Sequence, residues 1–159
     1  MAGGFAWVVK GVGILAVDKQ PPVVFELALP LFGLSLVGVA LLTSRGIRRT
    51  IVVSLGWLAV ATGLGATVSE LLDVTVHEGI AASALALLIG QMTLPRSGQA
   101  PAAMTFWTGV GTLPALAVGG ALAEIDERLL EIPLVCVGLA WMRVGWVTLH
   151  KLRAAPASA

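Results

Sequence analysis

Long runs of apolar residues, separated by short polar stretches, organise the whole chain. Five of them approach the length of about 20 residues that a helix needs to cross a bilayer. They cover residues 23–43, 51–69, 76–94, 102–123 and 129–149. Because backbone groups in lipid must be hydrogen-bonded within their own segment, we predict that each run is helical. The pattern predicts an all-α fold over residues 1–159: one membrane domain, a polytopic bundle of five transmembrane helices arranged as helical hairpins.

A shorter apolar run covers residues 3–17. At about 1.5 Å per residue it would extend about 22 Å, less than the bilayer core of about 30 Å. Lys10 lies near its middle, where a lysine costs about 2.5–3.5 kcal/mol on insertion scales. Two alternatives stay open: a short, tilted sixth span, or a helix lying on the outer surface of the membrane. A weak repeat, in which the first 46 residues match the stretch ending at Gly98, favours the span.

The composition supports a membrane environment and excludes some partners. Only 12% of the residues are charged, against about 25% in soluble domains, and 57% are hydrophobic. The net charge of +1 is too small to indicate nucleic acid as a partner. The single cysteine, Cys136, excludes an internal disulfide. The lipid bilayer is therefore the first partner that the sequence predicts.

The charges in the connectors differ in sign from one connector to the next. Basic residues fill the first and third connectors and follow the last span: Arg45, Arg48, Arg49, Arg96, Lys151 and Arg153. The second and fourth connectors are mostly acidic. Since short loops rich in Lys and Arg stay cytoplasmic, we predict a cytoplasmic tail at residues 150–159. The chain also resembles small Gly/Ala/Val-rich membrane proteins of bacteria and archaea, which implies a prokaryotic plasma membrane.

The acidic connectors and the span ends beside them contain the residues best suited to bind ions or transfer protons. An ion or proton pathway is one interpretation, and its candidates are Glu26, Glu70, Asp73, His77, Glu78, Glu124 and Glu131. The other interpretation needs no function, because carboxylates near helix N-termini are favoured by the helix dipole. Glu70, Asp73 and His77 have a helical spacing, yet no compact ligand signature such as H-E-x-x-H is present. We therefore predict no metal site.

Two further features concern helix contacts and lipid. Small residues recur at every fourth position of the fourth span, at Gly111, Ala115, Gly119 and Ala123, which predicts close helix packing or an oligomer seam. Arg143 lies inside the fifth predicted span, where it can snorkel to headgroups or contact a lipid phosphate. Its flanking residues Trp141 and Trp146 are typical of an interfacial belt. Serine and threonine side chains in the spans are predicted to bond to their own backbone or to a neighbouring helix.

No enzyme signature is present: the chain lacks G-x-S-x-G, a P-loop and CxxC, and no cofactor is indicated. We therefore predict a non-enzymatic membrane protein that acts through helix–helix association, by self-association or as an accessory subunit of a membrane complex. The alternative is a small cation or proton transporter or channel with an acidic extracytoplasmic mouth. A lipid-modifying enzyme that uses Arg143 to hold a phosphate ranks last, because the sequence offers no nucleophile–base pair.

Overall fold

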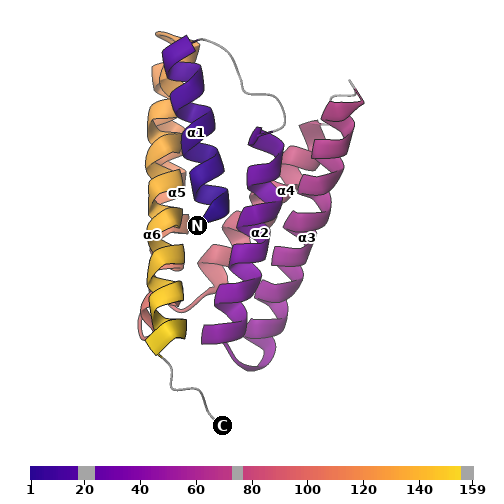
Figure 1. Cartoon of the computed structure of the whole chain (residues 1–159), viewed down its shortest axis with the longest axis vertical. Helices are drawn as coiled ribbons and strands as arrows, with labels where there is room; N and C mark the ends of the chain where they lie inside the picture. The colour runs from indigo at the N-terminus through magenta and orange to yellow at the C-terminus, as the bar shows by residue number, and fades with distance from the viewer. Residues whose placement is uncertain (18–23, 73–76, 155–159) are drawn as a thin grey trace.

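The structure, a computed structural model, describes residues 1–17, 24–72 and 77–154, and all the regular structure in these residues is helical (Figure 1). The prediction of an all-α fold is confirmed. The α-helices are α1 (Ala2–Val17), α2 (Val24–Thr43), α3 (Gly46–Leu71), α4 (His77–Thr93), α5 (Ala100–Ala123) and α6 (Glu131–Ala154), and the short 3-10 helix η1 (Glu127–Leu130) precedes α6.

The prediction of five full-length spans is only partly confirmed. Three helices of the described residues are long and apolar enough to cross a membrane, over Gly46–Ser69, Ala100–Ala123 and Glu127–Arg153. The described apolar parts of α2 and α4, Leu27–Thr43 and Glu78–Thr93, are shorter. For α4, 17 residues at about 1.5 Å each give about 25 Å, less than a core of about 30 Å. The apolar run at residues 76–94 is therefore longer than α4, the helix that it forms.

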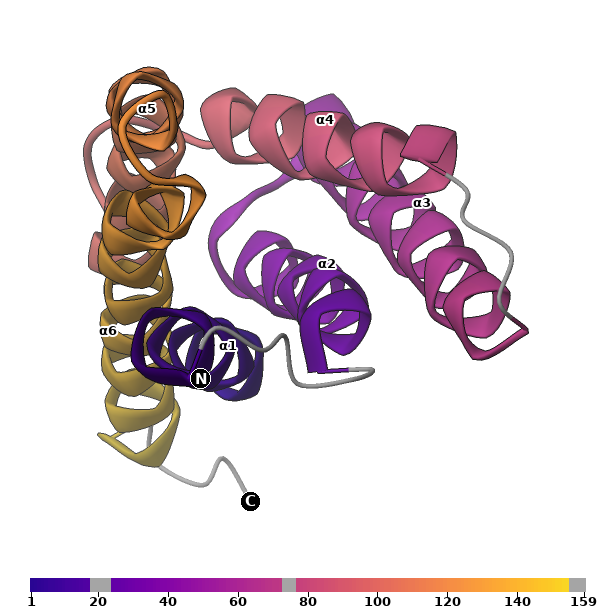
Figure 2. The same cartoon turned by 90° about the horizontal axis from the view of Figure 1, so that it is seen from above.

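The helices run alternately up and down, and α2 lies at the centre. Figure 2 shows α1, α3, α4 and α6 arranged around α2. The apolar composition of α2 permits this central position, because a helix that is apolar on all sides can be buried, but composition alone does not select α2 for it. Its residues Leu29, Phe32 and Leu36 are 0–2% exposed and form much of the core, with Val52 from α3 and Val144 from α6.

Helix α1 lies within the bundle, along α6 and beside α2. It runs antiparallel to α6, and Met1 lies beside Gly145 rather than at the end of α6. Ala2–Val17 is apolar but shorter than a full span, so both alternatives for this run stay predictions. The 16 residues of α1 reach about 24 Å, which explains why α1 follows only part of the length of α6.

Several helix ends differ from the predicted boundaries. The predicted first connector included Arg48 and Arg49, but α3 already begins at Gly46. Arginine is a good helix former, so a helix can extend past its apolar run into the aqueous rim. The turn before α3 uses Gly46 at a φ of 59°, a conformation that side chains disfavour. Helix α6 likewise continues to Ala154, into the predicted tail.

Apart from Lys10 and Arg143, which lie within α1 and α6, the described charged residues gather at the two ends of the bundle. Arg45, Arg48 and Arg49 lie at the α2–α3 connection, at the same end as Arg96, Lys151 and Arg153, and all six are exposed. Lys151 donates a hydrogen bond to Gln99 in the α4–α5 connection, with 2.7 Å between Nζ and Oε1. The exposed Glu78, Glu124 and Glu127 lie at the opposite end. The predicted separation of charge is thus present among the described residues.

The acidic end contains a local cap. Asp126 precedes η1, and its Oδ1 accepts a hydrogen bond from the backbone N–H of Arg128 at 3.0 Å. The Arg128 guanidinium donates to the same carboxylate. The backbone hydrogen bond first, and then the side-chain hydrogen bond and charge of Arg128, hold the pKa of Asp126 below its usual range. Asp126 therefore supports this turn at neutral pH, and its contribution is lost as the pH falls through that lowered pKa.

Glycine permits close contacts between helices, as the α2–α3 and α1–α6 crossings illustrate. At the α2–α3 crossing, a Cβ on Gly33 would lie 2.7 Å from the carbonyl oxygen of Gly56. At the α1–α6 crossing, a Cβ on Gly138 would lie 3.0 Å from the carbonyl oxygen of Gly4. The predicted hydroxyl bonds are present for most serine and threonine side chains of the spans. Thr67 and Thr105, among others, donate to the carbonyl four residues back in their own helix, and Ser83 of α4 donates to the Ala59 carbonyl of α3.

Candidate functional site

A buried ion pair joins α1 to α6. The Lys10 Nζ lies 3.6 Å from Oε1 of Glu131, and the two side chains are 7% and 6% exposed. In so little contact with water the charges are screened weakly, but their desolvation is also costly, so such a pair depends on good local geometry. The sequence identified both residues as unusual without connecting them. The cost assigned to Lys10 is therefore offset in part by Glu131.

Glycine makes room for this pair. A Cβ on Gly11 would lie 2.5 Å from Cγ2 of Val135 and 3.3 Å from Oε2 of Glu131. Oε2 itself is buried and has no hydrogen-bond partner among the described residues. The carboxylate therefore interacts chiefly through its other oxygen, with Lys10. This dependence on one partner makes the pair sensitive to substitution.

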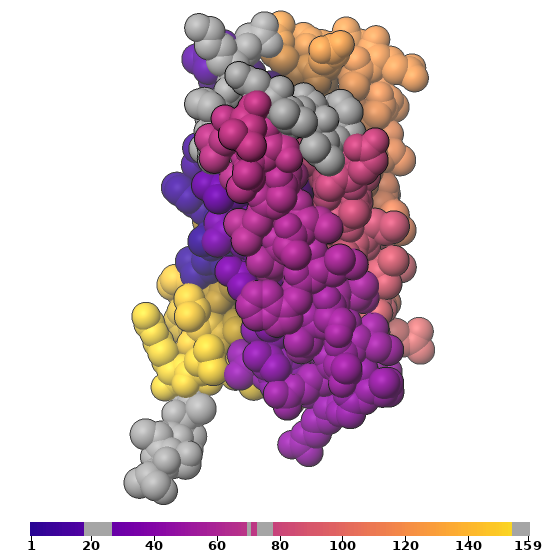
Figure 3. Space-filling model, turned by 90° about the vertical axis from the view of Figure 1, so that its right-hand side faces the viewer, coloured from indigo at the N-terminus to yellow at the C-terminus, as the bar shows by residue number. Residues whose placement is uncertain are grey.

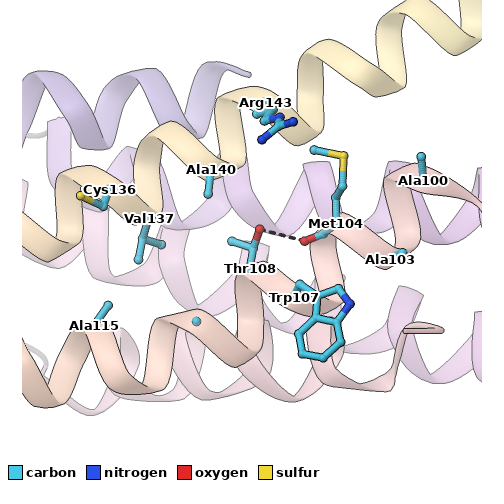
Figure 4. A pocket seen from close by; sticks show the side chains of 11 residues that line it. Ala100, Ala103, Met104, Trp107, Thr108, Ala115, Cys136, Val137, Ala140 and Arg143 are labelled. Carbon is cyan, nitrogen blue, oxygen red and sulfur yellow. Dashed lines mark hydrogen bonds between the residues drawn. The ribbon is translucent and has the colours of Figure 1, made fainter. Parts of the chain in front are cut away.

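An open groove of about 680 Å³ lies between α5 and α6 (Figure 4). Side chains of α5 form one wall and side chains of α6 form the other. The wall residues are mostly small, and the larger ones lie toward one end: Ala100, Ala103, Met104, Trp107, Thr108, Gly111, Ala115, Cys136, Val137, Ala140 and Arg143. We call this surface the α5–α6 groove. Its walls contain no acidic side chain among the described residues.

The predicted small-residue stripe of α5 divides between two environments. Gly111 and Ala115 line the α5–α6 groove, and a Cβ on Gly111 would meet nothing within 4 Å. Gly119 is buried, because Leu130 and Pro133 cover it: a Cβ there would lie 2.8 Å from Cδ1 of Leu130. Ala123 is half-buried at the end of the helix. Internal packing thus accounts for Gly119, whereas Gly111 faces open space, and the predicted oligomer seam stays a prediction.

Arg143 is exposed and lines the α5–α6 groove. Within the described residues no carboxylate lies within 4 Å of it, so its charge is available to a headgroup or a phosphate. The prediction that both flanking tryptophans belong to an interfacial belt is wrong for Trp141. Trp146 is 56% exposed, as an interfacial residue would be, but Trp141 is 3% exposed and packs against Phe32. One face of α6 turns inward at residue 141, which an apolar run does not reveal.

The predicted pathway residues do not come together in the described part of the chain. Glu78 and Glu124 are exposed near helix ends, and Glu131 is buried beside Lys10. Asp73 and the side chains of Glu26, Glu70 and His77 lie outside the described residues. Among the residues that are described, no group of three or more His, Cys, Asp or Glu could hold a metal ion. The transport pathway stays a prediction.

Comparisons with known proteins add no functional assignment. No protein-family model, curated protein or solved structure significantly matches the chain.

Proposed function

We propose that the chain is a small integral membrane protein in which α2 to α6 each cross the bilayer, with α1 as a sixth, partial span. The basic end faces the cytoplasm, together with the C-terminal end of α6. The membrane is the plasma membrane of a prokaryote.

The distribution of polarity over the surface supports this placement. Large apolar side chains are exposed between the two charged ends on every α-helix; Phe5, Leu34, Trp57, Leu85, Trp107 and Leu139 are each at least 40% exposed. Figure 3 shows the outer face that α3 contributes. Soluble monomers rarely expose such continuous apolar surface, whereas hydrocarbon chains cover it at no cost.

The topology predicts opposite labelling of two exposed positions. Ile47 at the basic end is 76% exposed and Ile125 at the acidic end is 78% exposed, so each tolerates replacement by cysteine. In a Cys136→Ser background, we expect a membrane-impermeant maleimide to label Ile125→Cys in intact cells, and Ile47→Cys only after lysis. Ser97→Cys, also exposed and at the basic end, should behave like Ile47→Cys. Labelling of Ile47→Cys and Ile125→Cys from the same side would contradict the topology.

The proposed work of the protein is helix–helix association, by self-association or as an accessory subunit of a membrane complex. The exposure of α5 carries this proposal. Only 11% of the most apolar stretch of α5 is buried in the bundle, against 39% for α3 and 28% for α6. In lipid no hydrophobic force drives helices together, so association depends on surfaces that permit close packing. The small residues of the α5–α6 groove provide such a surface.

Gly111→Ile is expected to weaken association at least tenfold without disturbing the fold. A Cβ at this position would meet nothing within 4 Å, so the backbone need not move, and the rest of the side chain would occupy the α5–α6 groove. Cross-linking and native mass spectrometry in mild detergent measure the assembled fraction. Gly119→Ile would be a poor probe, because Leu130 already occupies that space.

Gly65→Ile is the matched control for this test. Gly65 lies on α3 and is exposed, and a Cβ there would also meet nothing within 4 Å, so the same substitution should leave assembly unchanged. Loss of a homo-oligomer in Gly111→Ile supports self-association, and loss of a co-purifying membrane subunit supports the accessory role. Equal assembly of the two variants would remove the α5–α6 groove as the seam.

A further inference from the structure

A second cavity of about 390 Å³ lies nearer the centre of the bundle, between α1, α2, α4, α5 and α6. We call it the central cavity. Its size falls in the range of about 300–1,000 Å³ that is usual for small-molecule sites. The lining is almost wholly apolar and uncharged: Trp7, Leu29, Phe32, Ala84, Leu85, Leu87, Leu88, Gln91, Thr112, Leu116, Leu134, Val137 and Trp141.

Three aromatic rings from three helices form one side of the central cavity. The ring centroids of Trp7 and Phe32 lie 5.2 Å apart, and those of Phe32 and Trp141 lie 5.1 Å apart. Phe32 and Trp141 are 2% and 3% exposed, so this wall is fixed by packing. Rigid, apolar walls of this kind suit a hydrocarbon group, since an apolar cavity stays dry and readily accepts an apolar molecule.

The central cavity also contains an unsatisfied polar side chain. Gln91 of α4 is 4% exposed, and its Oε1 is buried without a hydrogen-bond partner among the described residues. Its Oε1 lies on the side of Gly109. A half turn of the amide exchanges the oxygen and the NH₂ group, so a ligand in the central cavity could meet either. A buried amide oxygen without a partner is costly, and a ligand that donates a hydrogen bond to the amide recovers that cost.

The Thr112 hydroxyl indicates which polar group a ligand would carry. The Thr112 hydroxyl donates to the carbonyl oxygen of Thr108 at 2.8 Å, so its oxygen can still accept a hydrogen bond. Gln91 offers both a donor and an acceptor. A hydroxyl group both donates and accepts, whereas an ether or a ketone only accepts. Among the described residues no charged side chain lines the central cavity, which disfavours a charged headgroup.

The central cavity reaches the outside between α4 and α5. Leu85 of α4 and Leu116 of α5 line it and are also 57% and 47% exposed. Because these side chains belong to the apolar outer surface, the opening faces the hydrocarbon region when the helices cross a membrane. A molecule dissolved in the bilayer could therefore enter from the side.

We propose that the central cavity binds a neutral lipid with a free hydroxyl group. The hydroxyl hydrogen-bonds with Gln91, and the hydrocarbon lies against Trp7, Phe32 and Trp141. This binding does not depend on self-association or on the α5–α6 groove, so the failure of either leaves the other untouched.

Fluorescence quenching by brominated probes tests the proposal. Trp57, Trp107 and Trp146 are each more than 50% exposed, so replacing all three by Phe leaves only the tryptophans of the central cavity, Trp7 and Trp141. The probes are 12-bromododecan-1-ol and 1-bromododecane in bromine-free detergent. We expect saturable quenching by the alcohol. Gln91→Leu should weaken the binding of the alcohol about tenfold and leave the binding of the alkane unchanged, because only the alcohol loses a hydrogen bond.

A matched variant and a second measurement complete the test. Gln99→Leu removes an exposed glutamine outside the central cavity and should affect neither probe. If the triple tryptophan variant does not fold, the melting temperature of the unsubstituted protein is measured instead of quenching. Dodecan-1-ol should raise this melting temperature more than dodecane does, and the difference should vanish in Gln91→Leu. Non-saturable quenching, or an alcohol effect that Gln91→Leu leaves unchanged, overturns the proposal.

Discussion

Lys10→Met is expected to lower the free energy of unfolding by about 3–5 kcal/mol, the usual cost of removing one partner of a buried ion pair. The substitution keeps most of the side-chain volume and removes the ammonium 3.6 Å from Glu131. The carboxylate then stays buried, with Oε2 already lacking a hydrogen-bond partner among the described residues. Reversible unfolding of the purified protein in mixed micelles, with increasing denaturing detergent, measures the loss.

A double variant distinguishes the loss of the ion pair from the burial of an unpaired charge. Replacing Glu131 by Leu in the Lys10→Met background removes both charges, and we expect stability to return to within about 1 kcal/mol of the original, because apolar replacements of buried pairs are often neutral or better. A double-mutant cycle then gives the coupling between the two residues.

The exposed pair at the acidic end provides the comparison. Arg128 Nε lies 3.2 Å from Oδ1 of Asp126, at a similar spacing, but these side chains are 45% and 41% exposed. Arg128→Met should therefore cost far less than Lys10→Met, because water screens an exposed pair. If Lys10→Met costs as little as Arg128→Met, the buried pair contributes nothing particular to the fold.

The existence of the helices was predictable, but their depth in the bundle was not. Apolar runs located α2 to α6, although α3 and α6 extend beyond their runs, because a long apolar run that must satisfy its own backbone hydrogen bonds forms a helix. Helices α2 and α5 are both apolar on every side, yet Phe32 is 2% exposed and Trp107 is 58% exposed. Lipid and protein interior are equally apolar, so hydrophobicity alone cannot distinguish a central helix from a peripheral one.

The candidate sites were harder to predict for the same reason. Lys10 and Glu131 are both ionisable residues within or beside apolar runs, but apolar runs alone do not indicate that the first helix packs against the last. One signal was present: Gly4 and Gly11 are seven residues apart (11 − 4 = 7), and so are Glu131 and Gly138 (138 − 131 = 7). Antiparallel helices with matching heptads place Gly4 against Gly138 and Gly11 beside Glu131, as observed. Gln91 gave no such signal, since its lack of a partner among the described residues is a property of the packed bundle.

The α1–α6 crossing should be as sensitive to volume as the ion pair is to charge. A Cβ on Gly138 would lie 3.0 Å from both the Gly4 carbonyl oxygen and Cγ2 of Val8. The Gly4 oxygen is a backbone atom, so it cannot move aside unless the whole of α1 moves. Gly138→Val is therefore expected to cost about 3 kcal/mol, at the upper end of the usual overpacking range.

Displacement of α1 gives this variant a readout besides stability. Lys10 is 6% exposed, so its amine should react slowly with an acylating reagent in the original protein and several-fold faster in Gly138→Val. Gly120→Val is the matched control, because a Cβ on Gly120 meets nothing within 4 Å. It should preserve both the free energy of unfolding and the slow reaction of Lys10. If Gly138→Val behaves like Gly120→Val, the α1–α6 crossing is looser than its backbone contacts imply, and the buried pair cannot depend on that crossing for its position.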